Sequence, residues 1–291
     1  MIMSLQKYQA LITSIECGSI TKAAEVLGYT QSGVSRMIQE LEKEWNLSLI
    51  ERSKSGVFLT SDGFKLFDQM KRICNEQLIL SQYIDDLNDC QSGLLRIGVF
   101  SSVATHWLPN IMKHYKNDFP NIQIELLLGD YTEIEEWILE GRVDFGFLRL
   151  PTNQKFETLS VEPNDRLMVI LPQNHPLVDC EKFPMQKLEE YPFILLEKGV
   201  NAEISRLFEQ NKIHPQINFK TWDDYAIMSM VENGLGISIL PELILSRIPY
   251  QIVAKELDTP YYRNIGIAMR SQRNLPKAAK QFLEYLPYRK E

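Results

Sequence analysis

Residues 19–45 read SITKAAEVLGYTQSGVSRMIQELEKEW, and this stretch decides the fold of the first part of the chain. Apolar and small side chains recur at helical spacing on both sides of Gly28, which predicts two amphipathic helices joined by a tight turn. Ser19 and Thr30 stand where the two helices would begin, because their hydroxyl oxygens can accept hydrogen bonds from backbone N–H groups of the first turn. The second helix is expected over Gln31–Trp45. The pattern therefore predicts a helix-turn-helix.

The polar side chains of the second expected helix gather on one side. Its apolar face is formed by Val34, Ile38, Leu41 and Trp45. We expect the opposite face and its N-cap to contact DNA through Thr30, Gln31, Ser32, Ser35, Arg36 and Gln39. Glutamine can form two hydrogen bonds with adenine and arginine two with guanine in the major groove, whereas serine hydroxyls and a helix N-terminus suit phosphate. A small structural helical bundle with a polar outer face would show the same pattern, so the pattern alone leaves both interpretations open.

A β-wing is expected directly after this helix. Two short extended runs, residues 47–52 and 57–60, flank a turn that contains Gly56. We expect Arg52 to project toward phosphates or into a minor groove, whereas Lys54 is better explained as a solvated charge.

Charge gives this DNA-binding interpretation little support. The chain carries a net charge of −7, and residues 1–60 hold six basic and six acidic side chains. A basic DNA-binding domain is therefore not visible as net charge. Any contact with DNA must depend on where the basic residues lie.

A long helix is expected over residues 61–90, which contain no proline and no glycine after Gly63. Mostly apolar residues recur along it in alternating steps of four and three, the a/d pattern of a two-helix coiled coil. We expect this seam to form a dimer interface through Leu66, Met70, Ile73, Gln77, Leu80, Ile84 and Leu87. The polar Gln77 would fix the register of the two helices. A second stripe could pack on the winged domain through Phe64, Phe67, Cys74 and Leu78. A single helix buried against its own domain is the alternative.

From Gln91 on, strand-like and helical runs alternate, which predicts an α/β region with mostly parallel sheets. We expect two lobes, the first over about residues 91–161 and 266–291 and the second over about 162–265. The cleft between two such lobes is the default ligand site. Residues 101–105 place Ser and Thr at a helix N-terminus after a buried strand, where an anionic or polar ligand could bind. A plain N-cap would look the same.

The sequence contains no recognisable catalytic or metal-binding motif. Its four histidines show no HExxH spacing, and no GxSxG elbow or P-loop is present, so we expect neither an enzyme nor a metal site. The glycine pair Gly234 and Gly236 falls short of GxGxxG, which disfavours a dinucleotide site, and no cofactor is expected. The four cysteines form no CxxC pair and favour reduced thiols. Without a signal-peptide pattern or a long apolar run, we expect a cytoplasmic protein with no membrane partner.

Several motifs in order resemble the LysR-type transcriptional regulators. They are GSITKAAEVL at 18–27, TQSGVSR at 30–36, IQELE at 38–42, LIER at 49–52 and LTSDG at 59–63. The resemblance implies a multi-domain α plus α/β fold. A winged helix-turn-helix over residues 1–60 would precede a dimerising linker helix over 61–90. A two-lobed α/β effector domain, similar to periplasmic binding proteins, would follow over 91–291.

The resemblance also implies a function, a set of site residues and a set of partners. The expected function is sequence-specific promoter binding that a small-molecule effector between the two lobes modulates. Expected partners are double-stranded promoter DNA, the effector and further copies of the chain as dimers and tetramers, with RNA polymerase a candidate partner. On the resemblance, the effector site is expected around Ser101, Ser102, Asp130, Arg149, Lys198, Gly199 and Trp222. Trp222 could stack on a ring or belong to the core.

One departure and one alternative accompany this resemblance. Gly33 stands where the family often has proline or alanine, which leaves the base preference open. An exported solute-binding protein with a helical cap is the alternative class, and the missing export signal disfavours it.

Overall fold

The computed structural model describes residues 4–53, 55–87, 93–196 and 203–290. The chain divides into two compact units, residues 1–88 with 140–142 and residues 89–139 with 143–291. Predicted residues Lys198 and Gly199 lie outside the described residues, as does Lys54, and of Leu87 only the backbone is described.

The first unit begins with the predicted helix-turn-helix. It comprises α1 (Leu5–Glu16), α2 (Ile20–Leu27) and α3 (Gln31–Trp45). Thr30 Oγ1 accepts a hydrogen bond from the backbone N–H of Gly33 at 3.1 Å, which stabilises the first turn of α3 as its N-cap. Gly28 ends α2 with a φ of 69°, a left-handed conformation that favours glycine. The tight turn and the bounds of α3 therefore agree with the sequence pattern.

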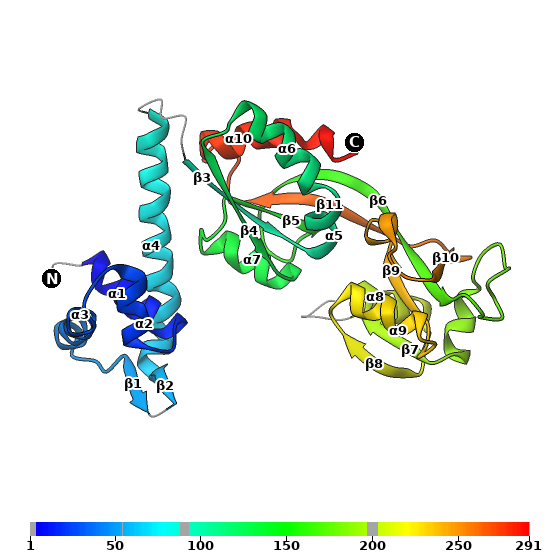
Figure 1. Ribbon diagram of the computed structural model, residues 1–291, viewed down its shortest axis with the longest axis horizontal. Coiled ribbons are helices and arrows are strands. Elements are labelled where there is room, and N and C mark those ends of the chain that lie inside the picture. The colour runs from blue at the N-terminus through cyan, green and yellow to red at the C-terminus, as the bar shows by residue number, and fades with distance from the viewer. Residues whose placement is uncertain (1–3, 54, 88–92, 197–202, 291) are drawn as a thin grey trace. The chain divides into compact units, whose positions relative to one another are not determined.

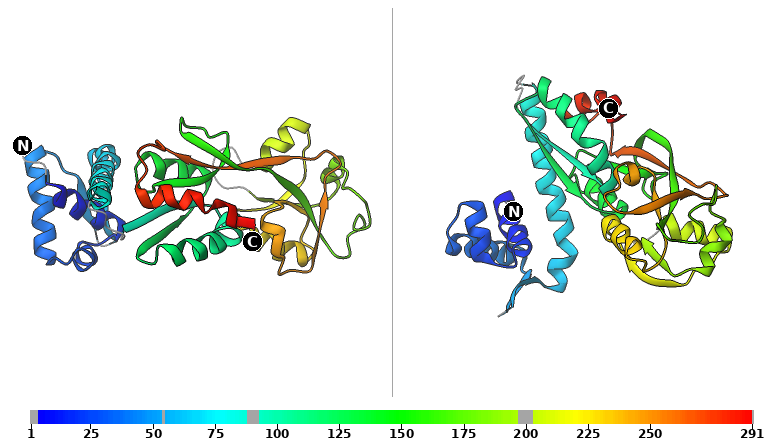
Figure 2. Two further views of the ribbon diagram at one scale, coloured as in Figure 1. Left: turned by 90° about the horizontal axis from the view of Figure 1, so that it is seen from above. Right: turned by 45° about the vertical axis from the view of Figure 1, so that its right-hand side comes forward.

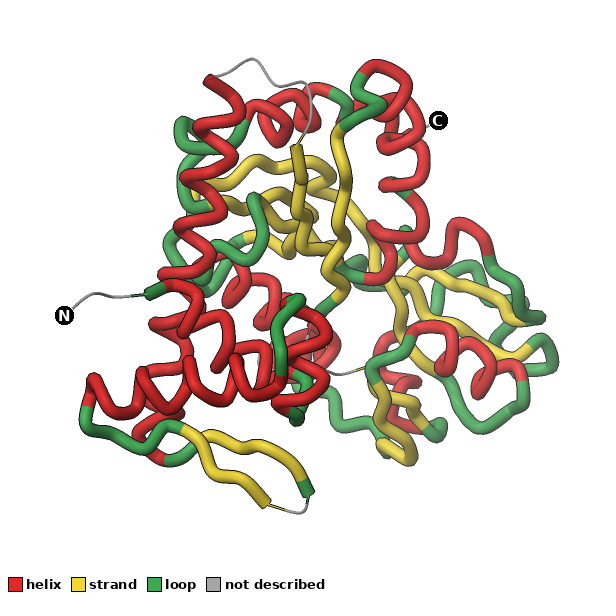
Figure 3. Tube along the Cα trace, turned by 60° about the vertical axis from the view of Figure 1, so that its left-hand side comes forward, coloured by secondary structure: helices red, strands yellow, loops and turns green. Residues whose placement is uncertain are grey.

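The wing and the long helix complete this unit. Strands β1 (Ile50–Ser53) and β2 (Gly56–Leu59) form an antiparallel hairpin, drawn in yellow at one end of the helical cluster in Figure 3. Helix α4 (Ser61–Leu87) starts immediately after β2. A Cβ atom at Gly63 would lie 2.0 Å from the carbonyl oxygen of Leu49, so only glycine permits this close approach of α4 to the wing.

The second unit is built on a seven-stranded mixed sheet in the order β10-β6-β11-β5-β3-β4, with β9 paired to β6. Its strands are β3 (Gly93–Val99), β4 (Ile122–Leu128), β5 (Phe145–Leu150), β6 (Glu157–Pro172), β9 (Ser238–Pro241), β10 (Ile252–Glu256) and β11 (Tyr262–Met269). Strands β6 and β11 run side by side between the two lobes in Figures 1 and 2. Strand β6 is 16 residues long, and this length lets it extend from the first lobe into the second.

The expectation of mostly parallel sheets is wrong for this unit. Only β3 with β4, β3 with β5, and β7 (Phe193–Leu196) with β8 (Ile217–Thr221) pair in parallel among the described strands. The pairs that involve β6 or β11 are antiparallel. The reason is that the chain leaves the first lobe along β6 and returns along β11, and two such crossing strands run in opposite directions.

Each lobe has its own hydrophobic core. The first lobe packs α5 (Ser101–His106), α6 (Leu108–Asp118), α7 (Tyr131–Leu139) and α10 (Lys277–Glu284) around β3, β5 and part of β11. The second packs α8 (Glu203–Asn211) and α9 (Asp224–Glu232) around β7, β9 and part of β6. Short 3-10 helices lie at Met185–Glu190, Ile244–Arg247 and Leu286–Lys290. The carboxyl ends of β3 and β4 and the N-termini of α8 and α9 carry the residues of the site described next.

Candidate functional site

The polar face of α3 is open to solvent in the first unit. Its apolar face is committed to the core, since Val34 and Ile38 have no exposed surface. The predicted DNA-contacting residues are exposed, except Ser35, which is half-buried: Thr30, Gln31, Ser32, Ser35, Arg36, Gln39 and Arg52. The geometry thus places these side chains on one accessible surface.

The wing is joined to α3 by a direct side-chain contact. Arg52 of β1 donates a hydrogen bond from Nη2 to the hydroxyl oxygen of Ser35 at 3.0 Å. This contact places a guanidinium beside the polar face of the helix. Arg36 pairs with Glu40 at 2.9 Å, and the guanidinium holds the pKa of that carboxyl below its usual value. Because the Arg36 pair is exposed, its net stabilisation is small and a nucleic acid can compete for the guanidinium.

The predicted dimer seam on α4 divides into two halves. Met70 is 2% exposed and lies in the core of the winged domain, where Leu66 and Ile73 also pack. This half of the seam therefore packs within its own chain. The expectation that Met70 faces a partner helix is wrong. The physical reason is that α4 passes directly over α1 and the wing. Leu80 and Ile84, in contrast, are 58% and 50% exposed.

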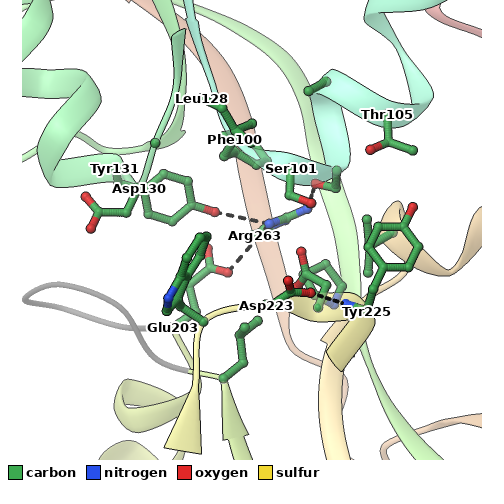
Figure 4. Close-up of a pocket in the computed structure, with 18 of the residues that line it drawn as sticks. Phe100, Ser101, Thr105, Leu128, Asp130, Tyr131, Glu203, Asp223, Tyr225 and Arg263 are labelled. Atoms are coloured by element: carbon green, nitrogen blue, oxygen red, sulfur yellow. Dashed lines mark hydrogen bonds and ion pairs between the residues drawn. The ribbon is translucent and has the colours of Figure 1, made fainter. Parts of the chain in front are cut away.

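A cavity of about 500 Å³ lies between the two lobes of the second unit (Figure 4). Four of the predicted effector residues line it: Ser101, Ser102, Asp130 and Trp222. Arg149 does not line the cavity, but its Nε lies 3.6 Å from Oε1 of Glu203, which does. Lys198 and Gly199 belong to the residues that are not described.

Arg263 is the central polar residue of this cavity, and the sequence patterns did not predict it. Its guanidinium forms an ion pair with Asp165 of β6 and donates hydrogen bonds to the hydroxyls of Tyr131 and Ser102 at 3.1 and 2.8 Å. Both members of the ion pair are 5% exposed. Burial by itself lowers the Arg263 pKa, but Tyr131, Asp165 and Glu203 raise it above its ordinary value, so the side chain stays charged. A single buried cation therefore links α5, α7, β6 and β11.

Glu203 lies at the start of α8, on the opposite side of the cavity from Ser101 in the close-up. Its side chain is 9% exposed, and Oε2 lies 3.9 Å from Nη1 of Arg263. Burial raises the pKa of this carboxyl, and the nearby Arg263 and Arg149 oppose that rise. Atom Oε1 has no hydrogen-bond partner among the described residues. The carboxylate is held by electrostatic attraction while one oxygen keeps its hydrogen-bonding capacity.

Two further carboxyls come from the N-terminus of α9. Asp223 caps the helix, and its Oδ1 accepts hydrogen bonds from the N–H groups of Tyr225 and Ala226 at 2.9 and 3.0 Å. Burial raises the pKa of Asp224, while Arg263 and a hydrogen bond from Ser101 lower it. The pair Asp223-Asp224 precedes an apolar helical run, so the N-cap signal was readable in the sequence.

The rest of the cavity surface is apolar and aromatic. Phe100 and Tyr131 meet edge to face with ring centroids 5.2 Å apart. Trp222 is 60% exposed, so it does not belong to a core. Further apolar lining comes from Leu128, Leu196, Tyr225, Pro241 and Ile244. The cavity can therefore enclose a small organic molecule that has both charged and apolar parts.

No group of three or more His, Cys, Asp or Glu side chains in the described ranges is placed to hold a metal ion. No helix in the same ranges is long and apolar enough to cross a membrane.

Two family models match the chain. The model for the bacterial regulatory helix-turn-helix protein of the lysR family covers residues 5–64. The model for the LysR substrate binding domain covers residues 89–289. Together they span both units.

Curated relatives match over nearly the full length. A probable HTH-type transcriptional regulator LrrA from Synechococcus elongatus is 30% identical over 286 residues, which are 98% of this chain and 96% of that protein. The uncharacterized HTH-type transcriptional regulator YvbU from Bacillus subtilis is 28% identical over 287 residues, 97% of each chain.

Among solved structures, the LysR family transcriptional regulator CbnR matches with a TM-score of 0.75 at 19% identity, covering 99% of this chain and all of that one. Full-length CbnR complexed with its target DNA matches with a TM-score of 0.73 at 20% identity, covering 99% of this chain and all of that one. At this identity the likeness shows a shared fold.

Proposed function

The chain belongs to the LysR family of transcriptional regulators, and from this premise we propose that it binds promoter DNA through α3 and the wing under the control of a small molecule in the cavity between its lobes. The proposal assigns DNA binding to residues 1–60, dimerisation to residues 61–90 and effector binding to residues 91–291. A promoter-binding role also places the protein in the cytoplasm.

The observation that carries the DNA-binding part is the exposed polar face of α3 with Arg52 beside it. A recognition helix inserts such a face into the major groove, and its N-terminal side chains meet base edges. Gln31, Gln39 and Arg36 are the base-reading candidates. Ser32, Ser35 and Arg52 suit phosphate, because hydroxyl and guanidinium groups donate to phosphate oxygens. Since the unit is not strongly basic, a second copy of this surface is needed to add phosphate contacts.

Dimerisation would use the part of α4 that the winged domain leaves open. Leu80 and Ile84 continue the heptad spacing after Gln77, and all three side chains are exposed. Pairing two such helices buries these leucine and isoleucine side chains and presents two recognition helices to a two-fold-related site. Assembly of dimers into tetramers and a contact with RNA polymerase belong to the same proposal.

Control by the effector follows from the position of the cavity. Its lining residues come from both lobes, so a bound molecule has different contacts when the lobes move relative to each other. A ligand that prefers one lobe arrangement shifts the population toward it in proportion to its differential affinity. That shift would change the placement of the DNA-binding units.

The test starts with selection of DNA sequences from a randomised duplex library by the purified full chain. The selected duplex is then labelled, and its affinity is measured by fluorescence anisotropy for the wild type and for Gln31→Ala. Loss of preference for the selected duplex in Gln31→Ala is the expected result. Arg273→Ala, an exposed residue of the second unit, serves as the control that keeps the preference. Failure to enrich any sequence would overturn the proposal.

A further inference from the structure

We propose that the effector is a small organic cation, a protonated amine attached to an apolar group, held by Glu203 and Asp224 in the cavity between the lobes. This inference rests on the proposed function and names the chemical class of its ligand. It differs from the sequence expectation that the Ser/Thr-rich start of α5 favours an anionic or polar ligand.

The cavity lining contains more acidic than basic side chains. Among the described lining residues, four side chains are carboxyls and one is a guanidinium. The carboxyls are Asp130, Glu203, Asp223 and Asp224, and the guanidinium is Arg263. A cavity with low-dielectric walls and a surplus of carboxyl groups concentrates cations and repels anions.

The guanidinium of Arg263 already has hydrogen-bond partners within the protein. Arg263 donates to Asp165, Tyr131 and Ser102, and it is 5% exposed. An anionic ligand would have to share this guanidinium with Asp165 and would bring a further negative charge close to Glu203 and Asp224, which is unfavourable. The other nearby cation, Arg149, does not line the cavity and lies 3.6 Å from Glu203.

Glu203 supplies the independent observation that points to a ligand. Its side chain is nine-tenths buried and lines the cavity, and Oε1 has no hydrogen-bond partner among the described residues. Arg149 Nε lies 3.6 Å from this oxygen, too far for a hydrogen bond, so a ligand that donates to Oε1 can form a hydrogen bond that the described residues do not supply. A primary ammonium carries three donors and suits such an acceptor.

The remaining lining fits the other end of such a molecule. Phe100, Tyr131, Trp222 and Tyr225 are aromatic, and Leu128 and Ile244 are aliphatic. Aromatic faces attract cations as well as apolar groups, so they suit an ammonium and the chain that carries it. The volume of about 500 Å³ accommodates a small metabolite.

The experiment uses two sets of probes, and within each set the apolar part is the same and the polar head group differs. Phenethylamine, 2-phenylethanol and 3-phenylpropanoate share one apolar part and carry an ammonium, a hydroxyl and a carboxylate. Hexylamine, hexan-1-ol and heptanoate form a second set. Binding to the full chain is measured by thermal shift at millimolar probe and then by calorimetry. We expect the amines to bind about tenfold or more tighter than their matched alcohols, with no binding by the carboxylates.

Variants locate the effect. Glu203→Gln should weaken amine binding by about tenfold, the loss expected for one charge-assisted hydrogen bond, and Asp224→Asn should weaken it as well. Glu181→Gln removes an exposed carboxyl of the same lobe outside the cavity and should bind amines as the wild type does. If Glu203→Gln unfolds, Asp224→Asn alone decides.

Other binding results would overturn the ligand class, the site or the effector control. Preferred binding of the carboxylates, equal binding of amine and alcohol, or no binding by any amine overturns the cationic class. Wild-type amine affinity in both cavity variants overturns the site. None of these results affects the proposed DNA binding, which the selected duplex tests separately. If amines bind but leave the affinity for that duplex unchanged, the ligand class stands and the proposed effector control fails.

Discussion

Arg263 donates a hydrogen bond from Nη2 to the hydroxyl oxygen of Ser102 at 2.8 Å, and neither residue is more than 5% exposed. Ser102 belongs to α5 of the first lobe, whereas Arg263 lies on β11, which crosses between the lobes. The same guanidinium lies 3.9 Å from Glu203 at the start of α8 in the second lobe. One side chain thus contacts both lobes at the cavity, so a ligand that moves Glu203 alters a contact shared by the two.

Replacement of Arg263 is expected to destabilise the second unit strongly. Arg263→Ala leaves Asp165 buried without its cation, and loss of one partner of a buried pair costs about 3–5 kcal/mol. Urea denaturation of the full chain should show an earlier transition for this unit. The double variant Asp165→Asn with Arg263→Ala should recover part of the loss, because no uncompensated charge remains. A transition unchanged from wild type in the single variant would contradict the role of this pair.

Local signals explain what the sequence predicted well. Thr30 and Gly28 mark the boundaries of α3 and α2 because capping and left-handed turns depend on neighbouring residues alone. The antiparallel pairing of β6 with β11 joins segments about a hundred residues apart, as Asp165 and Arg263 do, and no short pattern encodes it. A charged residue two positions before the apolar run 265–269 was the one available sign of Arg263.

The seam on α4 shows a second limit of sequence patterns. Heptad spacing marks which residues are apolar along one helix face, but not which neighbour covers them. Met70 is covered by the winged domain of its own chain, whereas Leu80 is 58% exposed. The spacing is continuous across both residues, so only the packing separates an intrachain core from a candidate interface.

Leu80→Asp is expected to dissociate the dimer without unfolding the chain. The substitution places a charge in the proposed interface at a residue that the single chain leaves exposed. Sedimentation velocity should report a monomer, and circular dichroism should show native helix content. Arg72→Asp, at an exposed position of α4 outside the seam, is the matched control and should remain a dimer. Unchanged sedimentation of Leu80→Asp would remove α4 as the dimer interface.

Met70→Asp should behave differently from Leu80→Asp. A carboxylate at a residue that is 2% exposed in an apolar core is strongly unfavourable, so the winged unit itself should lose about 3 kcal/mol of stability. The thermal transition of this unit should fall or disappear. Intact folding together with a monomeric state would instead mean that Met70 serves the dimer.

Arg52→Ala is expected to weaken DNA binding for specific and nonspecific duplexes alike. If each Arg52 of a dimer neutralises one phosphate, the slope of log affinity against log salt should become shallower by about 1.8, since each contact contributes about 0.9. Anisotropy titrations over a range of salt concentrations measure this slope. Gln39→Ala should leave the slope unchanged and relax preference for the selected sequence, because an uncharged residue releases no counterion. A slope unaffected by Arg52→Ala would exclude a phosphate contact.

Binding of an amine probe should release protons and weaken as the pH falls. Burial raises the pKa of Glu203 and of Asp224 above their ordinary values. The titratable groups that act on Glu203 are Arg263, Arg149, Asp165, Arg206 and Tyr131, and those that act on Asp224 are Arg263 and Asp223. An ammonium stabilises the ionised form of each carboxyl, so its binding lowers both pKa values and expels the protons that the free protein still holds.

The direction of this dependence follows from the raised pKa values. Above them the carboxyls are ionised and amine affinity is highest; as the pH falls through them, the carboxyls become protonated and the affinity is lost. Calorimetry of phenethylamine in buffers of different ionisation enthalpy measures the protons released. Glu203→Gln should release fewer, because one of the two titrating groups is gone, whereas Glu181→Gln should match the wild type. Proton uptake, or an affinity that rises on acidification, would contradict binding of the ammonium by these two carboxyls.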